Sequence, residues 1–168
     1  TNDVAALDVG GWQWQGYCSA KGRLLATFAL ARVSADRFEA VVPASTVEAL
    51  CKRLMMFRLR SKLTIEILAE KVVLLAATGD PMPGAAPAAD ISAQIALPDG
   101  RSLLVATAAS TDSLAMADQA ILNAWQLASI NALIPEVSAA TTEMFVPQMI
   151  GWDTVVPRGG VSFSKGCY

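Results

Sequence analysis

The chain has 168 residues, which is enough for one ordinary domain or two small ones. Hydrophobic residues make up 54% of it and charged residues 17%, so a large core is expected and intrinsic disorder is not. The formal net charge is -2, and no apolar run reaches the roughly 18 residues that a membrane-spanning helix needs, so we expect no membrane partner.

The residue types that are missing exclude several kinds of catalytic and binding site. The sequence has no histidine, which excludes Ser-His-Asp and Cys-His catalysis within these residues. Its three cysteines, Cys18, Cys51 and Cys167, form no Cys-x-x-Cys pair, so neither a zinc site nor a disulfide framework is indicated. The usual glycine-rich loops for nucleotide phosphates are missing too. We therefore predict no metal site and a location in the reducing cytoplasm.

The first part of the chain predicts a hairpin followed by a third strand. Residues 12–20 and 24–33 are rich in aromatic and aliphatic side chains and flank Lys21-Gly22-Arg23. Glycine tolerates the positive φ that a tight turn requires, so the two runs are expected to pair. Residues 37–42 are the third strand candidate.

A helix is predicted next. Ser45-Thr46-Val47-Glu48 has the pattern of a capping box, and apolar residues then recur at helical spacing from Val47 to Phe57. Residues 62–68 alternate polar and apolar side chains, which predicts a further strand. Together these elements predict a ferredoxin-like α+β lobe over residues 1–68.

Basic residues gather at the end of that helix. Residues 1–71 carry ten basic and seven acidic side chains, whereas residues 72–168 carry three and eight. Lys52, Arg53, Arg58, Arg60 and Lys62 form a cluster with no acid among them. The cluster is either a solvated helix face or a patch that meets an anion, such as the glutamate tail of a cofactor or RNA.

A second lobe is predicted over residues 69–135. Residues 72–77 read as a strand, residues 79–89 as a proline-rich loop, and residues 91–96 and 102–107 as a second hairpin. A helix is expected from Thr111. Its apolar stripe consists of Leu114, Ala117, Ile121, Trp125 and Ala128. Residues 136–168 lack clear periodicity, which predicts an extended segment that runs over the surface.

Cys167 is the strongest candidate for chemistry. It lies in a glycine turn two residues after Lys165, whose positive charge would favour the thiolate and lower the thiol pKa. The alternative is a buried structural cysteine without reactivity.

A few aromatic and polar residues are candidates for ligand binding. Trp125 either packs in the core or stands at the edge of a pocket, where its ring can stack on a flat heterocycle. Tyr17 on the first hairpin likewise either packs in the core or stands at the edge of a pocket. Trp12 and Trp14 are expected on one face of their strand. Asn2 and Asp3 either contact a polar ligand or serve only as caps.

The end of the chain carries the most specific motif. Residues 159–168 read Gly-Gly-Val-Ser-Phe-Ser-Lys-Gly-Cys-Tyr, which resembles the first half of the Lys-Gly-Cys-Tyr-x-Gly-Gln-Glu motif of the YgfZ family. Proteins of that family are bacterial, folate-binding relatives of the glycine-cleavage T-protein. Further segments resemble the family in the same order: residues 1–4, 17–24, 56–63 and 145–148, and Trp125 ten residues before Pro135.

The resemblance implies a fold and a function. The fold would be the folate-binding fold of the T-protein (GcvT) and YgfZ type. This chain would form two ferredoxin-like lobes of that fold and would lack its C-terminal β-barrel. We expect the chain to be incomplete at both ends. The function would be that of a tetrahydrofolate-binding accessory protein that supports assembly or repair of iron–sulfur clusters in client enzymes, including enzymes of tRNA processing. Trp125 would lie at the folate, and Lys165 and Cys167 would be the functional motif residues. No direct contact with nucleic acid is expected, and one motif cysteine cannot hold a cluster.

One departure bears on the alternative, a folate-dependent aminomethyltransferase or demethylating enzyme that resembles the T-protein. The T-protein carries aspartates in the strand after its glycine turn, and one of them is its essential acid/base group. The matching strand here reads Leu25-Ala26-Thr27-Phe28, without a carboxylate. This argues against classical aminomethyl transfer and leaves open whether the protein is an enzyme. A third possibility is a structural interaction module in which Cys167 is inert.

Overall fold

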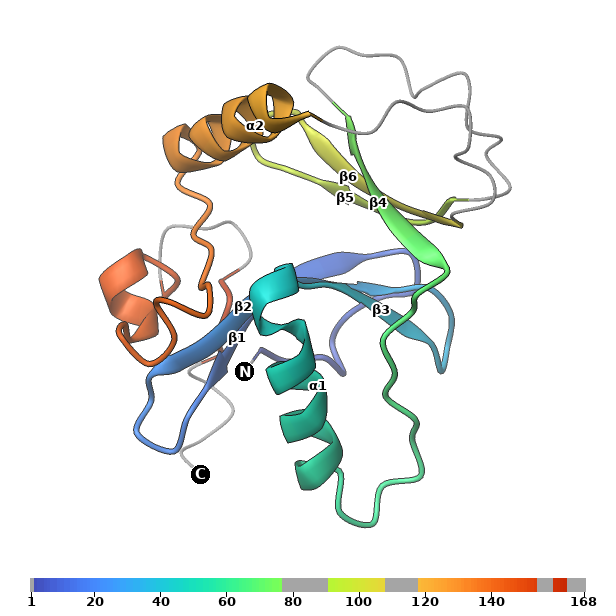
Figure 1. Cartoon of the computed structure of the whole chain (residues 1–168). Coiled ribbons are helices and arrows are strands. Elements are labelled where there is room, and N and C mark those ends of the chain that lie inside the picture. The colour runs from blue at the N-terminus through green and yellow to red at the C-terminus, as the bar shows by residue number, and fades with distance from the viewer. Residues whose placement is uncertain (1, 77–90, 108–117, 154–158, 163–168) are drawn as a thin grey trace. The chain divides into compact units, whose positions relative to one another are not determined.

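The computed structural model describes residues 2–76, 91–107, 118–153 and 159–162. Its elements belong to two compact units, Thr1–Leu68 with Glu136–Tyr168 and Ala69–Pro135. Each unit has its own antiparallel three-stranded sheet, which gives an α+β architecture (Figure 1). Within the described ranges, no helix is long and apolar enough to cross a membrane.

The first sheet has the order β1-β2-β3, with β1 at Trp12–Cys18, β2 at Leu24–Arg32 and β3 at Phe38–Val41. The predicted hairpin is confirmed, because β1 pairs with β2 along its whole length. Gly22 adopts a φ of 73° in the turn, a conformation that suits glycine. The third predicted strand is confirmed as well, with β3 paired to the second half of β2.

Helix α1, Ala44–Phe57, packs on this sheet through Leu50, which is buried against Ala26 and Phe28 of β2. The predicted capping box is wrong. Pro43 is the N-cap residue, and no side chain caps the helix. The Ser45 hydroxyl instead accepts a hydrogen bond from the backbone N–H of Ala139 at 3.3 Å, a partner that local sequence does not reveal.

The strand predicted at residues 62–68 is also wrong. The structure describes these residues, and they form no strand. Alternation of polar and apolar side chains predicts a strand when one face becomes buried. Here Leu63 and Ile67 are 45% and 51% exposed, so the apolar positions bury no face.

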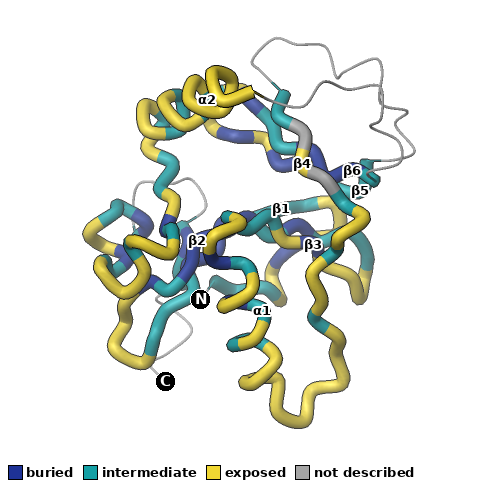
Figure 2. The backbone as a smooth tube through the Cα atoms, in the orientation of Figure 1, coloured by how far each residue is buried: buried dark blue, intermediate teal, exposed yellow. Residues whose placement is uncertain are grey.

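The second edge of β2 is shared between β3 and a segment from much later in the chain. Residues 29–32 pair with β3, whereas residues 24–27 bond to residues 137–145. Leu24 donates its backbone N–H to the carbonyl of Phe145 and accepts from Glu143, both at 2.8 Å. The Thr27 hydroxyl, which is buried, accepts from the backbone N–H of Val137 at 2.8 Å. Figure 2 shows β2 as the most deeply buried strand of this unit.

The second sheet has the order β4-β6-β5, with β4 at Lys71–Ala76, β5 at Ile91–Ala96 and β6 at Ser102–Thr107. The predicted strand and hairpin are confirmed. The proline-rich loop predicted at 79–89 lies outside the described residues.

Helix α2 runs over Gln119–Asn131, so the predicted start at Thr111 is wrong for this helix. Asp118 begins it instead, because its carboxylate accepts a hydrogen bond from the backbone N–H of Ile121 at 2.8 Å. Leu114 and Ala117 of the predicted stripe lie outside the described residues. No α2 residue is fully buried, and most of the helix is exposed (Figure 2). Trp125 and Ala128 are half-buried.

The bond between Thr27 and Val137 provides a test of how the late segment is held. In Thr27→Val the buried N–H of Val137 loses its acceptor, so we expect the free energy of unfolding to fall by about 1–3 kcal/mol. Urea denaturation measures the change. Thr27→Ser keeps the hydroxyl and serves as the control. Equal stability of Thr27→Val and the unchanged protein would show that this bond does not hold the segment.

Candidate functional site

The outer edge of β1 is covered by residues from both ends of the chain. The Asn2 side-chain amide donates to the backbone carbonyls of Trp14, at 3.3 Å, and of Gly159. The backbone N–H of Gly16 donates to the carbonyl of Gly160. An exposed strand edge needs such partners, because its N–H and C=O groups are otherwise unpaired. These bonds fix residues 159–160 against the first sheet.

Tryptophan packing also holds residues 159–160 against β1. Trp152 is fully buried, and its ring centroid lies 5.8 Å from that of Trp14. Trp12 and Trp14 share one face of β1, as predicted, and meet edge to face at 5.4 Å. Gly160 lies so close to the ring of Trp152 that an added Cβ would overlap it. The chain therefore passes Trp152 at a point where only glycine fits.

The two polar residues predicted to bind a ligand make hydrogen bonds within the protein. Besides its side-chain bonds, Asn2 donates its backbone N–H to the Gln15 side chain at 3.1 Å. The Asp3 carboxylate accepts from the backbone N–H of Ala5 at 3.1 Å. Their role in cofactor binding remains a prediction.

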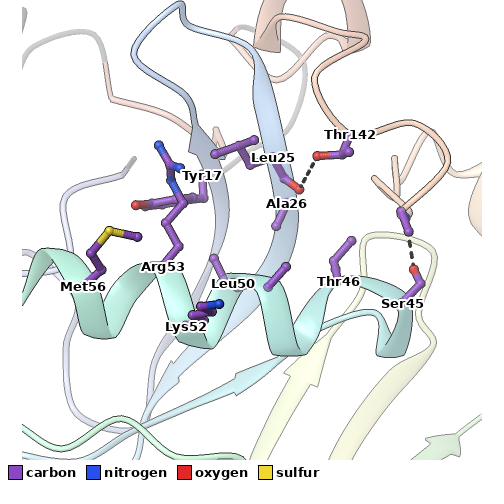
Figure 3. A pocket seen from close by; sticks show the side chains of 12 residues that line it. Tyr17, Leu25, Ala26, Ser45, Thr46, Leu50, Lys52, Arg53, Met56 and Thr142 are labelled. Atoms are coloured by element: carbon purple, nitrogen blue, oxygen red, sulfur yellow. Dashed lines mark hydrogen bonds between the residues drawn. The ribbon is translucent and has the colours of Figure 1, made fainter.

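Tyr17, another predicted ligand residue, lines a cavity of about 370 Å³ in the first unit (Figure 3). The cavity lies between α1, the β1–β2 hairpin and residues 139–142. The side chains of β2 and α1 make most of its wall apolar. The full lining consists of Tyr17, Leu25, Ala26, Ser45, Thr46, Ala49, Leu50, Lys52, Arg53, Met56, Ala139 and Thr142.

Two members of the predicted basic cluster, Lys52 and Arg53, line this cavity. The Arg53 guanidinium lies 6.0 Å from the ring centroid of Tyr17 and 5.2 Å from that of Phe57. The Thr142 hydroxyl donates to the carbonyl of Leu25 and is already occupied. The arrangement can accommodate an apolar group beside a cation. The helical spacing of the sequence places these cations on the helix, but no local pattern indicates that residues 139–142 close the cavity.

Trp125 belongs to the second unit, where it is half-buried and carries a cation over its ring. The Arg101 guanidinium lies 4.2 Å from the ring centroid and donates to the backbone carbonyl of Trp125 at 3.0 Å. Arg101 also forms an ion pair with Asp99 at 2.7 Å. Arg101 was not among the residues predicted to bind a ligand. The available signal was a cation directly after the Asp99-Gly100 turn, in a half of the chain with few basic residues.

The thiols that the structure describes are Cys18 and Cys51, and neither forms a disulfide. Burial raises the pKa of the Cys18 thiol above its ordinary value, which disfavours the reactive thiolate at neutral pH. Lys165 and Cys167 lie outside the described residues. Among the described residues, no group of His, Cys, Asp and Glu side chains is arranged to hold a metal ion.

Comparison with known proteins finds relatives that match the chain over its whole length. No family model matches the sequence. It is 29% identical to a protein of Serratia proteamaculans and 28% identical to one of Photorhabdus laumondii, both named tRNA-modifying protein YgfZ. An uncharacterized protein of Haemophilus influenzae is 23% identical. The matches cover 100% of this chain and 56% of each relative. The predicted resemblance to the YgfZ family is confirmed.

The C-terminal residues that cover the edge of β1 lie close in sequence to the YgfZ motif. Residues 159–162 directly precede the part of the YgfZ motif that contains Lys165 and Cys167. The bonds from Asn2 and Gly16 therefore fix the described residues nearest to that motif. Asn2 and the motif segment were singled out separately in the sequence, and the structure joins Asn2 to the start of that segment.

Gly160→Ala tests this anchor. The new Cβ overlaps the buried ring of Trp152, so we expect a loss of about 2–3 kcal/mol in the free energy of unfolding, measured by urea denaturation. Gly159→Ala is the neighbouring control, because its Cβ would lie 3.2 Å from a carbonyl oxygen and avoid the ring. Equal losses in the two variants would rule out ring overlap as the cause.

Proposed function

We propose that the protein containing this chain takes part in tRNA modification. The observation that carries the proposal is the similarity, over the full length of the chain, to two proteins named tRNA-modifying protein YgfZ. Because the chain spans 56% of the length of these relatives, the proposal concerns the activity of the whole protein.

We further propose that the ligand is tetrahydrofolate or a derivative, with Trp125 against the pterin ring. The half-buried position of Trp125 supports this, because a residue that is not fully enclosed can be reached by a ligand. Indole is a flat amphipathic plate that stacks favourably on a bicyclic heterocycle. Ligand sites of this kind combine such an apolar plate with a few polar groups, and Arg101 supplies a cation next to it.

In this proposal the protein assists iron–sulfur enzymes that modify tRNA, and Cys167 is the working thiol. Cys18 is poorly suited to that role, because burial raises its pKa. Lys165 would stabilise the Cys167 thiolate by its charge. The role is thus accessory: it supports assembly or repair of clusters held by client proteins, which are the expected partners.

The environment of Thr27 favours this accessory role over aminomethyl transfer. The T-protein chemistry needs a carboxylate in the strand after the glycine turn. Thr27 instead uses its buried hydroxyl to accept the backbone N–H of Val137. This position therefore serves the packing of the fold and offers no acid/base group.

The proposed role in tRNA modification predicts a cellular phenotype. In cells that lack the gene, we expect the full-length protein to restore the level of at least one modified tRNA nucleoside, and Cys167→Ser to fail to do so. Mass spectrometry of hydrolysed tRNA measures the levels. Cys18→Ser, expressed at the same level, is the matched control and should restore modification. An unchanged nucleoside profile in the deletion strain would contradict the proposal.

The proposed ligand predicts a saturable interaction with tetrahydrofolate. We expect isothermal titration calorimetry of the full-length protein to give one site, and Trp125→Ala to weaken its affinity about tenfold or more through the loss of stacking. Trp12→Ala is the control, because it removes a partly exposed tryptophan from the other unit. Binding that survives Trp125→Ala at full strength would exclude Trp125 as the pterin contact.

A further inference from the structure

Arg101 is the most deeply buried cation that the structure describes in the second unit. Only 6% of the residue is exposed, although arginine is normally a surface residue. It follows the tight turn between β5 and β6, where Gly100 adopts a φ of 87°. A buried charge is costly unless it is paired and hydrogen-bonded, so the contacts of Arg101 need an explanation.

Each nitrogen of the guanidinium has a defined partner. Nε donates to the Asp99 carboxylate at 2.7 Å, Nη1 to the Trp125 carbonyl at 3.0 Å, and Nη2 to the Ser129 hydroxyl at 3.1 Å. The Ser129 hydroxyl itself donates to the same Trp125 carbonyl at 3.0 Å. A planar group bound at three corners has little freedom to turn or shift.

The same guanidinium lies over the indole ring of Trp125. The distance from the guanidinium carbon to the ring centroid is 4.2 Å, well within the range of a cation–π contact. Arg101 thus holds Trp125 twice, through the backbone carbonyl and through the ring. The ion pair with Asp99 would suffice to neutralise the charge, and the hydrogen bond to Ser129 would suffice to join the hairpin to α2. The contact with the ring is additional.

We propose that Arg101 is a positioning residue that fixes the plane of the Trp125 indole and determines which flat ligands stack on its remaining surface. A cation on one face attracts the electrons of the ring. The opposite face then favours a neutral or electron-rich heterocycle and disfavours a cationic one, because two positive charges across one ring repel each other. Reduced pterins belong to the favoured class, and this identification of the ligand rests on the function proposed above.

Fluorine NMR of protein labelled with 5-fluorotryptophan separates positioning from mere stabilisation. Each of the four tryptophans of this chain contributes a signal, and Trp125→Phe identifies the one that belongs to Trp125. We expect Arg101→Met to shift or broaden that signal and leave the signals of Trp12, Trp14 and Trp152 in place. Ser129→Ala removes one hydrogen bond to Arg101 without touching the ring contact, and should leave the Trp125 signal close to its original position.

Ligand binding tests the functional half of the proposal. We expect Arg101→Met to lower the affinity for tetrahydrofolate about tenfold, and Arg101→Lys, which keeps the charge without the planar fork, to give an intermediate value. N-methylquinolinium, a flat cation, should bind Arg101→Met better than the unchanged protein. The double variant with Asp99→Asn and Arg101→Met replaces the single one if loss of the ion pair between Arg101 and Asp99 prevents folding.

The outcomes are distinct. An unmoved Trp125 signal in a folded Arg101→Met protein would overturn the positioning role. A shifted signal with unchanged preference between tetrahydrofolate and N-methylquinolinium would overturn the selection of ligands. If the unchanged protein binds no tetrahydrofolate, the proposed ligand fails, while the NMR signal and the N-methylquinolinium measurement still decide the role of Arg101.

Discussion

Strand β2 must have hydrogen-bond partners along both edges, and this requirement organises the first unit. One edge is satisfied by β1 within a local hairpin. The other edge is satisfied only in part by β3, and residues 24–27 depend on residues 137–145. Buried backbone groups without partners would be costly, so the sheet is incomplete until the late segment arrives. The cavity beside α1 exists because that segment passes over the helix and the strand.

Elements set by neighbouring residues could be predicted from the sequence. Both hairpins follow from glycine turns between strand-forming runs, and α1 follows from its apolar spacing. Prediction failed where a distant partner decides the outcome. Ser45 resembles a helix cap, but its hydroxyl bonds to Ala139. Residues 62–68 have the alternation of a strand, but no face of them is buried. Helix α2 begins after Asp118, whose carboxylate accepts the backbone N–H of Ile121, and therefore later than the predicted start at Thr111.

The candidate sites show the same division. Trp125 could be singled out by residue type and by resemblance, whereas Arg101 is visible only when β6 and α2 are folded together. Tyr17 could be named, but the cations and the segment that surround it come from distant positions. Asn2 could be named as a polar candidate, yet only the structure shows that it bonds to the residues that precede the Lys165–Cys167 motif. Residue types suggest chemistry, and long-range contacts determine which of them meet.

The order of the two units along the chain has a consequence for biosynthesis. Residues 69–135 form a contiguous unit placed inside the sequence of the first one. During translation, that inner unit has all its residues available before the ribosome has made Val137, which the outer sheet requires. The outer unit therefore closes after the inner one, and nascent chains that end before residue 137 carry a β2 strand with an open edge. Such chains are the natural targets for chaperones during synthesis.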